Sequence, residues 1–285
     1  GRAVLPGQDI RPRGQECRSG DQLLAAGVRV TPAVLGLAAA AGYDTLCTVR
    51  RPRVEILVLG DELLHTGLPR DGRIRDALGP MLAPWLRALG AEVTGTRRLG
   101  DDAEVLRTAV TASTADLVVT TGGTAAGPVD HVHPVLRRAG AEVLVDGVAV
   151  RPGHPMLLAR LAPGRHLVGL PGNPLAAVSG LLTLVEPFLR ALAGRTQCAP
   201  ARAPLAEGVH GHPHDTRLVP VAYRADGAGS GPYGTDRAVP LRFNGPAMLR
   251  GIAAADGLAV VPPGGAEAGA VVEILELSWF EGDIE

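Results

Sequence analysis

Four carboxylate residues of this sequence stand where a ligand-binding rim would need them. Each follows a short apolar run or closes the loop after one: Asp61, Glu62, Asp101 and Asp130. Carboxylates bind metal ions, and they repel phosphates and other oxyanions unless cations lie between the two. Asp101 and Asp130 also have a simpler explanation, because an aspartate at a helix start caps the helix and suits its dipole. Together the four acids predict a site that holds an anionic ligand with a cation.

Glycines and prolines crowd the loops beside these acids. Gly122 and Gly123 follow the run ADLVVTT, PGNP (171–174) follows RHLVGL, and RPGHP (151–155) is a related turn. Glycines let the backbone approach a ligand closely, and prolines fix the direction of the loop. Helix starts beside such loops favour anions such as phosphate. Each turn alone is also compatible with an ordinary connection, but together they predict a phosphorylated ligand.

Strands and helices alternate in the part of the chain that carries these loops. Apolar runs predict strands at 54–60, 91–95, 115–121 and 165–170, and amphipathic spacing predicts helices at 77–90, 101–113, 130–140 and 174–193. The run VEILVLG is apolar on both faces, as a strand between two helix layers requires. We therefore expect a three-layer α/β/α domain with a mostly parallel sheet over 51–194. Ligands bind such sheets at the carboxyl ends of the strands, where the acids and loops would meet.

The segments before and after this domain differ from it in composition and in the pattern of apolar residues. Residues 1–50 begin rich in Gly, Pro and Arg and then predict one helix, with Thr31 as its cap, Pro32 in its first turn and Gly42 after its end. This segment is too small to hold a core of its own. Residues 199–285 contain short β-like runs at 218–225, 238–243, 257–262 and 270–277, with one helix at 246–255. A separate, smaller β-rich domain is expected there.

The composition argues against several classes of function. Its 28 basic and 29 acidic residues give a net charge of −1, and its 3 Phe and 3 Tyr offer few stacking platforms, so no nucleic-acid partner is expected. Charge or glycine breaks each apolar run before the roughly 18 residues of a membrane span, so no membrane partner is expected. Every basic residue is an arginine, which excludes a Schiff-base lysine and a Gly-Lys-Ser/Thr phosphate loop.

Cysteine and histidine usage suggests neither a disulfide framework nor a structural metal. Three distant cysteines, Cys17, Cys47 and Cys198, form no CxxC pair. The first residues show no signal-peptide pattern, so a cytoplasmic protein is expected. The alternating run His210, His212 and His214 would place three imidazoles on one face of a strand, but Gly and Pro interrupt it and only Asp215 could complete a ligand set. We expect a solvated loop there.

Six segments of the chain closely resemble those of one family: LGDELL (59–64), DGRI (71–74), RLGDD (98–102), TTGGTAAGPVD (120–130), RPGHP (151–155) and LPGNPLAAV (170–178). Their order and spacing over 54–194 are similar to those of the molybdopterin molybdenumtransferases, the molybdenum insertases that include the enzymatic domain of gephyrin. The stretch before 54–194 resembles the linker that precedes this domain in the family, and 199–285 resembles its C-terminal β domain. The resemblance therefore divides the chain into a linker segment (1–50), a molybdopterin-binding domain (51–194) and a β domain (199–285).

The resemblance implies an activity and assigns residues to it. The family inserts molybdate into adenylylated molybdopterin, with Mg²⁺, and releases AMP, and it forms homodimers. Glu62, Asp101 and Asp130 occupy positions of its functional acids and are the candidate catalytic and metal-binding residues, and Glu16 falls where another acid is usual. The candidate substrate-binding residues are Asp61, Thr121, Gly122, Gly123, Gly127, Arg151, Pro152, Gly153, His154, Pro155, Pro171, Gly172, Asn173 and Pro174.

Departures from the family pattern leave alternatives open. Polar residues of the family are replaced by Leu59, Ala77, Leu78 and Ala125, and a lysine is replaced by His154. The family's N-terminal Met-Asp-Gly-Tyr-Ala stretch is also not among these residues, which suits either a fragment or a shortened relative. A non-catalytic molybdopterin binder or scaffold is therefore one alternative to the insertase. A molybdopterin adenylyltransferase, which shares the α/β domain, is another, although it normally lacks both the linker and the C-terminal domain.

Overall fold

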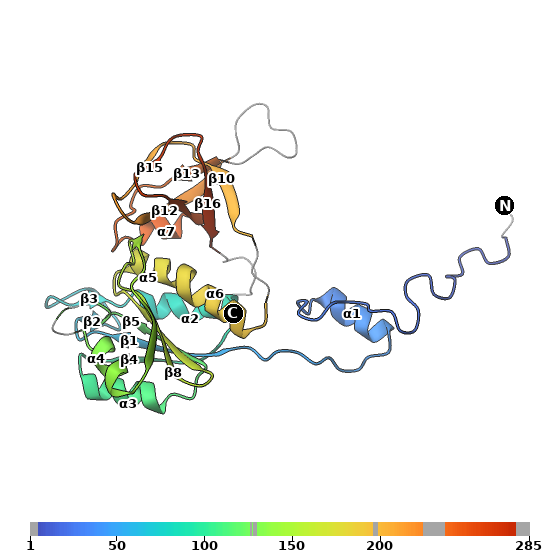
Figure 1. Ribbon diagram of the computed structural model, residues 1–285, viewed down its shortest axis with the longest axis horizontal. Helices are drawn as coiled ribbons and strands as arrows, with labels where there is room; N and C mark the ends of the chain where they lie inside the picture. Colours follow the sequence, from blue (N-terminus) through green and yellow to red (C-terminus); the bar gives the residue numbers. More distant parts are fainter. Residues whose placement is uncertain (1–4, 126, 128–129, 196–198, 225–236, 278–285) are drawn as a thin grey trace. The chain divides into compact units, whose positions relative to one another are not determined.

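The computed structural model describes residues 5–125, 127, 130–195, 199–224 and 237–277 (Figure 1). The chain divides into two compact units. One ends at Thr48 and takes in the short segment from Gly194, and the other begins at Val49 and contains most of the remaining chain. The first unit contains α1 (Pro32–Ala40), which Thr31 caps by accepting a hydrogen bond from the Val34 N–H at 3.3 Å. This helix begins where the sequence predicts it.

The second unit is built on a six-stranded sheet. Its strands are β1 (Arg53–Leu59), β4 (Glu92–Leu99), β5 (Leu117–Thr121), β6 (Glu142–Asp146), β8 (Leu157–Ala162) and β9 (Arg165–Leu170). Their order in the sheet is β4-β1-β5-β9-β8-β6. The four strands β4, β1, β5 and β9 are mutually parallel, whereas β8 and β6 add in antiparallel fashion. The mostly parallel sheet is confirmed. Its two antiparallel strands are not among the predicted strands.

Alternation of buried side chains along the strands creates two helix layers. Ile56 and Val58 of β1 pack with α2 (Leu78–Ala88), α5 (Pro174–Gly180), a π-helical turn (Leu181–Val185) and α6 (Glu186–Leu192). Leu57 and Leu59 of the same strand pack on the opposite face with α3 (Ala103–Ala112) and α4 (Val132–Arg138). Successive residues of a strand point to opposite faces, so a fully buried strand must be apolar throughout. The predicted three-layer architecture follows from this pattern and is confirmed.

The helical stretch from Pro174 to Leu192 passes a membrane-span test by length and composition. It has 19 residues and a mean hydropathy of 1.5, and just over half of it is buried in the protein. Leu175, Val178 and Leu181 belong to the core beneath the sheet. Packing against the sheet accounts for these apolar residues.

The C-terminal part forms its own antiparallel sheet. Its strands are β10 (Ala201–Pro204), β12 (Thr216–Arg224), β13 (Arg237–Pro240), β14 (Gly257–Val261) and β16 (Val271–Glu276), beside a short pair β11 (Val209–His210) and β15 (Gly265–Ala266). The predicted helix at 246–255 is only α7 (Arg250–Ala253). The β-rich character of this part is confirmed, and none of the strands described for it belongs to the central sheet.

The two sheets are nevertheless connected. β7 (Val150–Arg151), which lies in the α/β part of the sequence, pairs in parallel with the start of β12. Leu218, Ile252 and Leu258 of the C-terminal part share one apolar core with the helices α2, α5 and α6. Burial of this shared apolar surface stabilises the contact between the two parts, and it places the loop that carries the RPGHP motif between them.

Candidate functional site

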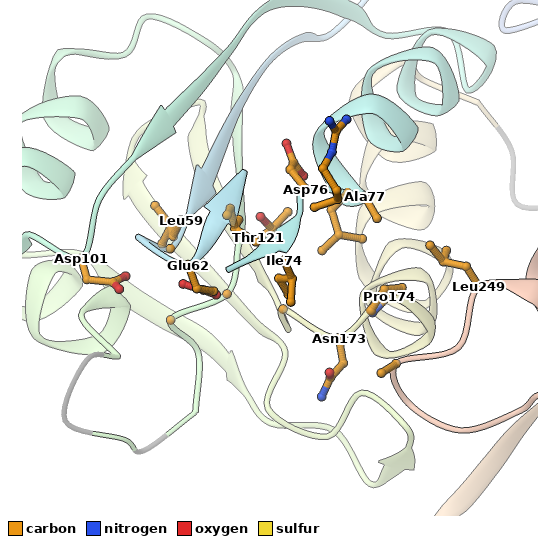
Figure 2. Close-up of a pocket in the computed structure, with 18 of the residues that line it drawn as sticks. Leu59, Glu62, Ile74, Asp76, Ala77, Asp101, Thr121, Asn173, Pro174 and Leu249 are labelled. Carbon is orange, nitrogen blue, oxygen red and sulfur yellow. The ribbon is translucent and has the colours of Figure 1, made fainter. Parts of the chain in front are cut away.

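A cavity of about 530 Å³ lies at the carboxyl ends of the parallel strands (Figure 2). Figure 2 shows Glu62 and Asp101 on the loops after β1 and β4, and Asn173 and Pro174 at the start of α5. We call this space the acidic cavity. It brings together nine of the predicted site residues: Glu62, Asp101, Thr121, Gly122, Gly123, Asp130, Gly172, Asn173 and Pro174.

Four carboxylates and Arg75 line the acidic cavity, and the carboxylates differ in whether they are paired with a cation. Among the residues that the structure describes, no arginine or histidine forms an ion pair with Glu62, Asp101 or Asp130. The fourth carboxylate that lines the cavity, Asp76, is paired in this way with Arg98 at 2.9 Å. Within the same described ranges, no three His, Cys, Asp or Glu side chains converge as a ready metal-ligand set. A cation bound here would need oxygens from a ligand as well.

Two adjacent aspartates after β4 have different surroundings. Asp102 caps α3, since its carboxylate accepts the N–H groups of Val105 at 3.0 Å and Glu104 at 2.8 Å. The hydrogen bond from Val105, and then that from Glu104, lowers the pKa of Asp102. Asp101 caps nothing and lines the cavity, where its carboxylate accepts the Asp61 N–H at 3.3 Å. The capping explanation thus holds for Asp102 and fails for Asp101.

Asp130 does not cap its helix either. The N-cap position of α4 belongs to His131, which makes no side-chain capping bond. The Asp130 carboxylate instead accepts the Gly127 N–H at 2.6 Å, so it closes its own loop. The His131 ring links this loop to the neighbouring one, because its Nε2 lies 3.2 Å from the Asp101 carbonyl oxygen and donates to it. Both loops of the acidic cavity are therefore tied together.

The glycine pair after β5 is required by backbone shape and packing. Gly122 and Gly123 have φ angles of 81° and 67°, in the left-handed region that favours glycine. A Cβ on Gly123 would lie 3.2 Å from Val132 and 3.3 Å from Leu59, which are packed side chains rather than open cavity. The turn is fixed further by the Gly122 N–H, which donates to Leu170 at 2.8 Å. This pair forms part of the cavity wall with its backbone.

A second cavity of about 400 Å³ adjoins the first and has the opposite charge. Arg151, His154, Arg217 and Asn244 line it, with prolines and glycines of the RPGHP, PGNP and 244–246 loops. We call it the basic cavity. Asn173 lines both cavities, and although it is the N-cap residue of α5 its side chain makes no capping bond. The predicted residues gathered here are Arg151, Pro152, Gly153, His154, Pro155, Pro171 and Asn173.

Backbone geometry brings the RPGHP loop close to α5. The Arg151–Pro152 peptide is cis, and Gly153 has a φ of 118°. A Cβ on Gly153 would lie 2.9 Å from Met156 and 3.0 Å from Ser179 of α5, so only glycine fits without a shift. The His154 ring faces back to its own loop, where Nδ1 lies 2.8 Å from the Val148 carbonyl oxygen and donates to it. Its Nε2 is thus the ring nitrogen left for a ligand.

Two predicted site residues, Gly127 and Asp61, line neither the acidic nor the basic cavity. Gly127 lines a third space of about 780 Å³ together with Asp130 and Arg151. Asp61 lines none of the three and contributes its N–H to Asp101. Arg217 and Asn244, which line the basic cavity from the C-terminal part, are not among the predicted site residues. The pairing of β7 with β12 places Arg217 beside Arg151, and Arg217 in turn donates to Asn244 Oδ1 at 3.3 Å.

The histidine run in the C-terminal part forms no metal site among the described residues. His210 belongs to the short strand β11, and His212 accepts the backbone N–H of Asp215 at its Nδ1, at 3.0 Å. His214 is exposed. The ring of His212 therefore serves a local turn.

This fold and its rim define a class of protein: a three-layer α/β protein with an acidic and a basic cavity side by side at the strand ends. Comparison with known proteins specifies the family. Residues 55–191 match the family described as "Probable molybdopterin binding domain", and residues 202–277 match "MoeA C-terminal region (domain IV)". A molybdopterin molybdenumtransferase of Staphylococcus epidermidis is 31% identical over 289 residues, which cover 97% of this chain and 67% of that protein. The chain belongs to the molybdopterin molybdenumtransferase family.

Other relatives agree with this assignment. A molybdopterin molybdenumtransferase of Staphylococcus aureus is 31% identical over 277 residues, covering 94% of this chain and 64% of its own length. A solved molybdopterin biosynthesis MoeA protein of Pyrococcus horikoshii has a TM-score of 0.71 at 27% identity, with 88% of this chain and 61% of that one covered. A second such structure, at 18% identity and a TM-score of 0.75, supports the fold alone. The chain spans about two thirds of the length of these relatives.

Proposed function

We propose that this protein inserts molybdate into adenylylated molybdopterin and releases AMP, in molybdenum cofactor biosynthesis. The observation that carries the proposal is the pair of adjoining cavities that share Asn173: Glu62, Asp101 and Asp130 line one, and Arg151 and Arg217 line the other. Family membership supports the reaction class, since the relatives are named molybdopterin molybdenumtransferases. An enzyme that joins two anions must hold both in one place despite their repulsion.

The charges of the cavities suggest which part of the substrates each one holds. Molybdate is an oxyanion, and arginine presents N–H donors in a planar fork that suits oxyanions. We assign it to the basic cavity, beside Arg151 and Arg217. The phosphate groups of adenylylated molybdopterin belong beside the acidic cavity, near the backbone of Gly122 and Gly123 and the start of α5. Asn173, with its side chain not used for capping, would contact both substrates.

The residues of the acidic cavity fit a magnesium ion. Mg²⁺ commonly uses one or two protein carboxylates and completes its shell with water and substrate phosphates. Among the described residues, Glu62, Asp101 and Asp130 form no ion pair with an arginine or histidine, and no complete metal-ligand set is present. They would hold Mg²⁺ together with the substrate's phosphate oxygens. When bound, the ion would neutralise charge that develops on the leaving AMP phosphate.

The departures from the family pattern alter the walls of the acidic cavity. Leu59, Ala77 and Leu78 all line it and give it an apolar side where the family has polar residues. Each lost hydrogen bond to a charged ligand group costs about 1.5–3 kcal/mol. The proposed enzyme would bind its ligand less tightly on this side and depend more on the backbone and the carboxylates. A non-catalytic binder would keep the cavity and lack turnover.

The match of residues 202–277 to the MoeA C-terminal region weighs against a molybdopterin adenylyltransferase. Three further proposals rest on the family resemblance. The chain divides into a linker segment (1–50), a molybdopterin-binding domain (51–194) and a C-terminal domain (199–285), with which the matched ranges 55–191 and 202–277 agree. The protein is a homodimer, and it acts in the cytoplasm.

Turnover by carboxylate variants tests the proposal. Glu62→Gln and Asp130→Asn keep the size of each side chain and remove its charge. The assay measures molybdate-dependent release of AMP from adenylylated molybdopterin, and the thermal midpoint reports folding. Glu92→Gln is the matched control, since Glu92 is an exposed acid on β4 that pairs with Arg53 away from the cavities. We expect loss of turnover in the two cavity variants only; full activity in both would exclude the assigned role.

A further inference from the structure

The side chain of Arg151 is held by an acid from the C-terminal part. Arg151 ends β7, and its Nε donates to Asp215 Oδ2 at 2.7 Å. Asp215 is 64 residues away in sequence and directly precedes β12. The contact therefore links the loop that lines the basic cavity to the C-terminal sheet.

The backbone around Asp215 is fixed on both sides. The next residue, Thr216, donates its N–H to Ala149 at 3.0 Å, beside the pairing of β7 with β12. On the preceding side, His212 Nδ1 accepts the Asp215 N–H at 3.0 Å and the His214 N–H at 3.3 Å. The Asp215 side chain is only 15% exposed. These contacts fix the position of the Asp215 carboxylate, which can therefore orient the Arg151 side chain.

The contact at Nε leaves the other end of the guanidinium for a ligand. An arginine has five N–H donors in one plane, one on Nε and four on the two Nη atoms. In the part of the chain that the structure describes, the Nη groups of Arg151 have no hydrogen-bond partner. The side chain is half exposed and lines the basic cavity. Because the group is planar, holding Nε also fixes the direction of both Nη atoms.

We propose that Asp215 is a positioning residue, which directs the Nη groups of Arg151 at an oxyanion in the basic cavity. The hydrogen bond with Arg151, more than any other influence, lowers the pKa of Asp215, so the carboxylate is ionised at neutral pH. Anion capture then depends on the C-terminal sheet as well as on the RPGHP loop. The identity of the anion as molybdate rests on the proposed function.

Orientation and charge act in opposite directions at this position. An arginine that is not held in place loses rotamer freedom when it binds an anion, which weakens binding. The negative charge of Asp215 also weakens binding, since it reduces the positive potential of the cavity. A single substitution of Asp215 mixes the two effects. Asp215→Asn and Asp215→Ala both remove the charge, but only asparagine keeps an acceptor oxygen within reach of Nε.

The test compares these two variants by calorimetry with molybdate, using the whole chain. We expect a dissociation constant about 3- to 10-fold higher for Asp215→Ala than for Asp215→Asn. In an Arg151→Ala background the difference should vanish, because the two residues would act as one unit. Glu142→Gln is the matched control: Glu142 also pairs with an arginine, Arg160, but on β6 and β8, outside the basic cavity. It should bind molybdate like the unaltered protein.

The outcomes separate this inference from the proposed function. Equal affinity of the Asn and Ala variants overturns the inference and leaves the proposed function intact, provided that the unaltered protein binds molybdate. A difference that persists without the Arg151 side chain also overturns it, because Asp215 would then act through the turn alone. No molybdate binding by the unaltered protein overturns both. Should Asp215→Ala fail to fold, Asp215→Glu keeps the charge and moves the carboxylate, and an affinity equal to that of the unaltered protein would refute the inference.

Discussion

Replacement of Arg98 by methionine should destabilise this protein more than neutralisation of its partner Asp76. Asp76 precedes α2 beside the acidic cavity, where its carboxylate accepts the Gly79 N–H at 2.8 Å. Arg98 donates to the same carboxylate from Nε at 3.0 Å and from Nη2 at 2.9 Å. The Asp76 side chain is 2% exposed and the Arg98 side chain 34%. The two partners thus differ in what their loss leaves behind.

The magnitude follows from this difference in exposure. Arg98→Met leaves a buried carboxylate without its cation, a change that costs about 3–5 kcal/mol of unfolding free energy. Asp76→Asn leaves an arginine that water can reach, so only the charge-assisted hydrogen bonds are lost, at about 1.5–3 kcal/mol. We expect Arg98→Met to be the more damaging change by about 1–2 kcal/mol.

Urea unfolding at pH 7 measures both variants and their combination. Adding Asp76→Asn to Arg98→Met removes the stranded charge, so the double variant should be more stable than Arg98→Met alone. The reasoning fails if Arg98→Met costs no more than Asp76→Asn. The reasoning also fails if the two effects are additive, that is, if adding Asp76→Asn to Arg98→Met lowers the unfolding free energy by as much as Asp76→Asn does alone.

Three further predictions concern folding and pH. Gly153→Ala should lower the thermal midpoint far more than Gly164→Ala, since both have positive φ but only the first would place a Cβ within 3.0 Å of other atoms; similar shifts would contradict the packing argument. The hydrogen bond from Arg50 lowers the pKa of Asp116 in the folded protein, so the ionised carboxylate stabilises the fold. This contribution is fully present above the ordinary aspartate pKa of about 4 and is lost as the pH falls through the pKa that Asp116 has in the folded protein. The stability difference between the protein and Asp116→Asn should therefore shrink below about pH 4 in acid titrations followed by circular dichroism. Burial lowers the pKa of His166, so the unfolded chain takes up a proton first and stability should fall as pH drops below about 6.5; His166→Leu should abolish this fall in urea titrations.

The parallel part of the fold was predictable from the sequence because its physics is local. A strand between two helix layers must be apolar on both faces, and VEILVLG and ADLVVTT meet this requirement. The antiparallel strands β6 and β8 were missed, since β6 is mostly exposed and its residues carry no such pattern. The connection through β7 was also missed, because pairing with β12 depends on contacts between residues more than 60 positions apart.

The part of the candidate site that lies in the α/β domain was predictable from the sequence, and the part contributed by the C-terminal sheet was not. The acids and the Gly/Pro loops are each marked by their place after a strand, and the parallel sheet brings most of them to one rim. Sequence position could not separate Asp101 from Asp102, because the capping bonds depend on the actual turn of the backbone. Arg217 and Asn244 lie in a different sheet, so no spacing within the α/β part could indicate them.

The central claim is that Glu62, Asp101 and Asp130 of the acidic cavity serve the reaction rather than the fold. The release of AMP by two variants at neighbouring positions tests this claim most directly. Asp101→Ala removes a cavity carboxylate, and Asp102→Ala removes the adjacent helix cap. With adenylylated molybdopterin, molybdate and Mg²⁺, the unaltered protein should release AMP. Asp101→Ala should lose at least about 10-fold in rate with its thermal midpoint unchanged, whereas Asp102→Ala should lower the midpoint and keep its turnover when folded. Equal turnover in Asp101→Ala and the unaltered protein, or no turnover in the unaltered protein, would contradict the account.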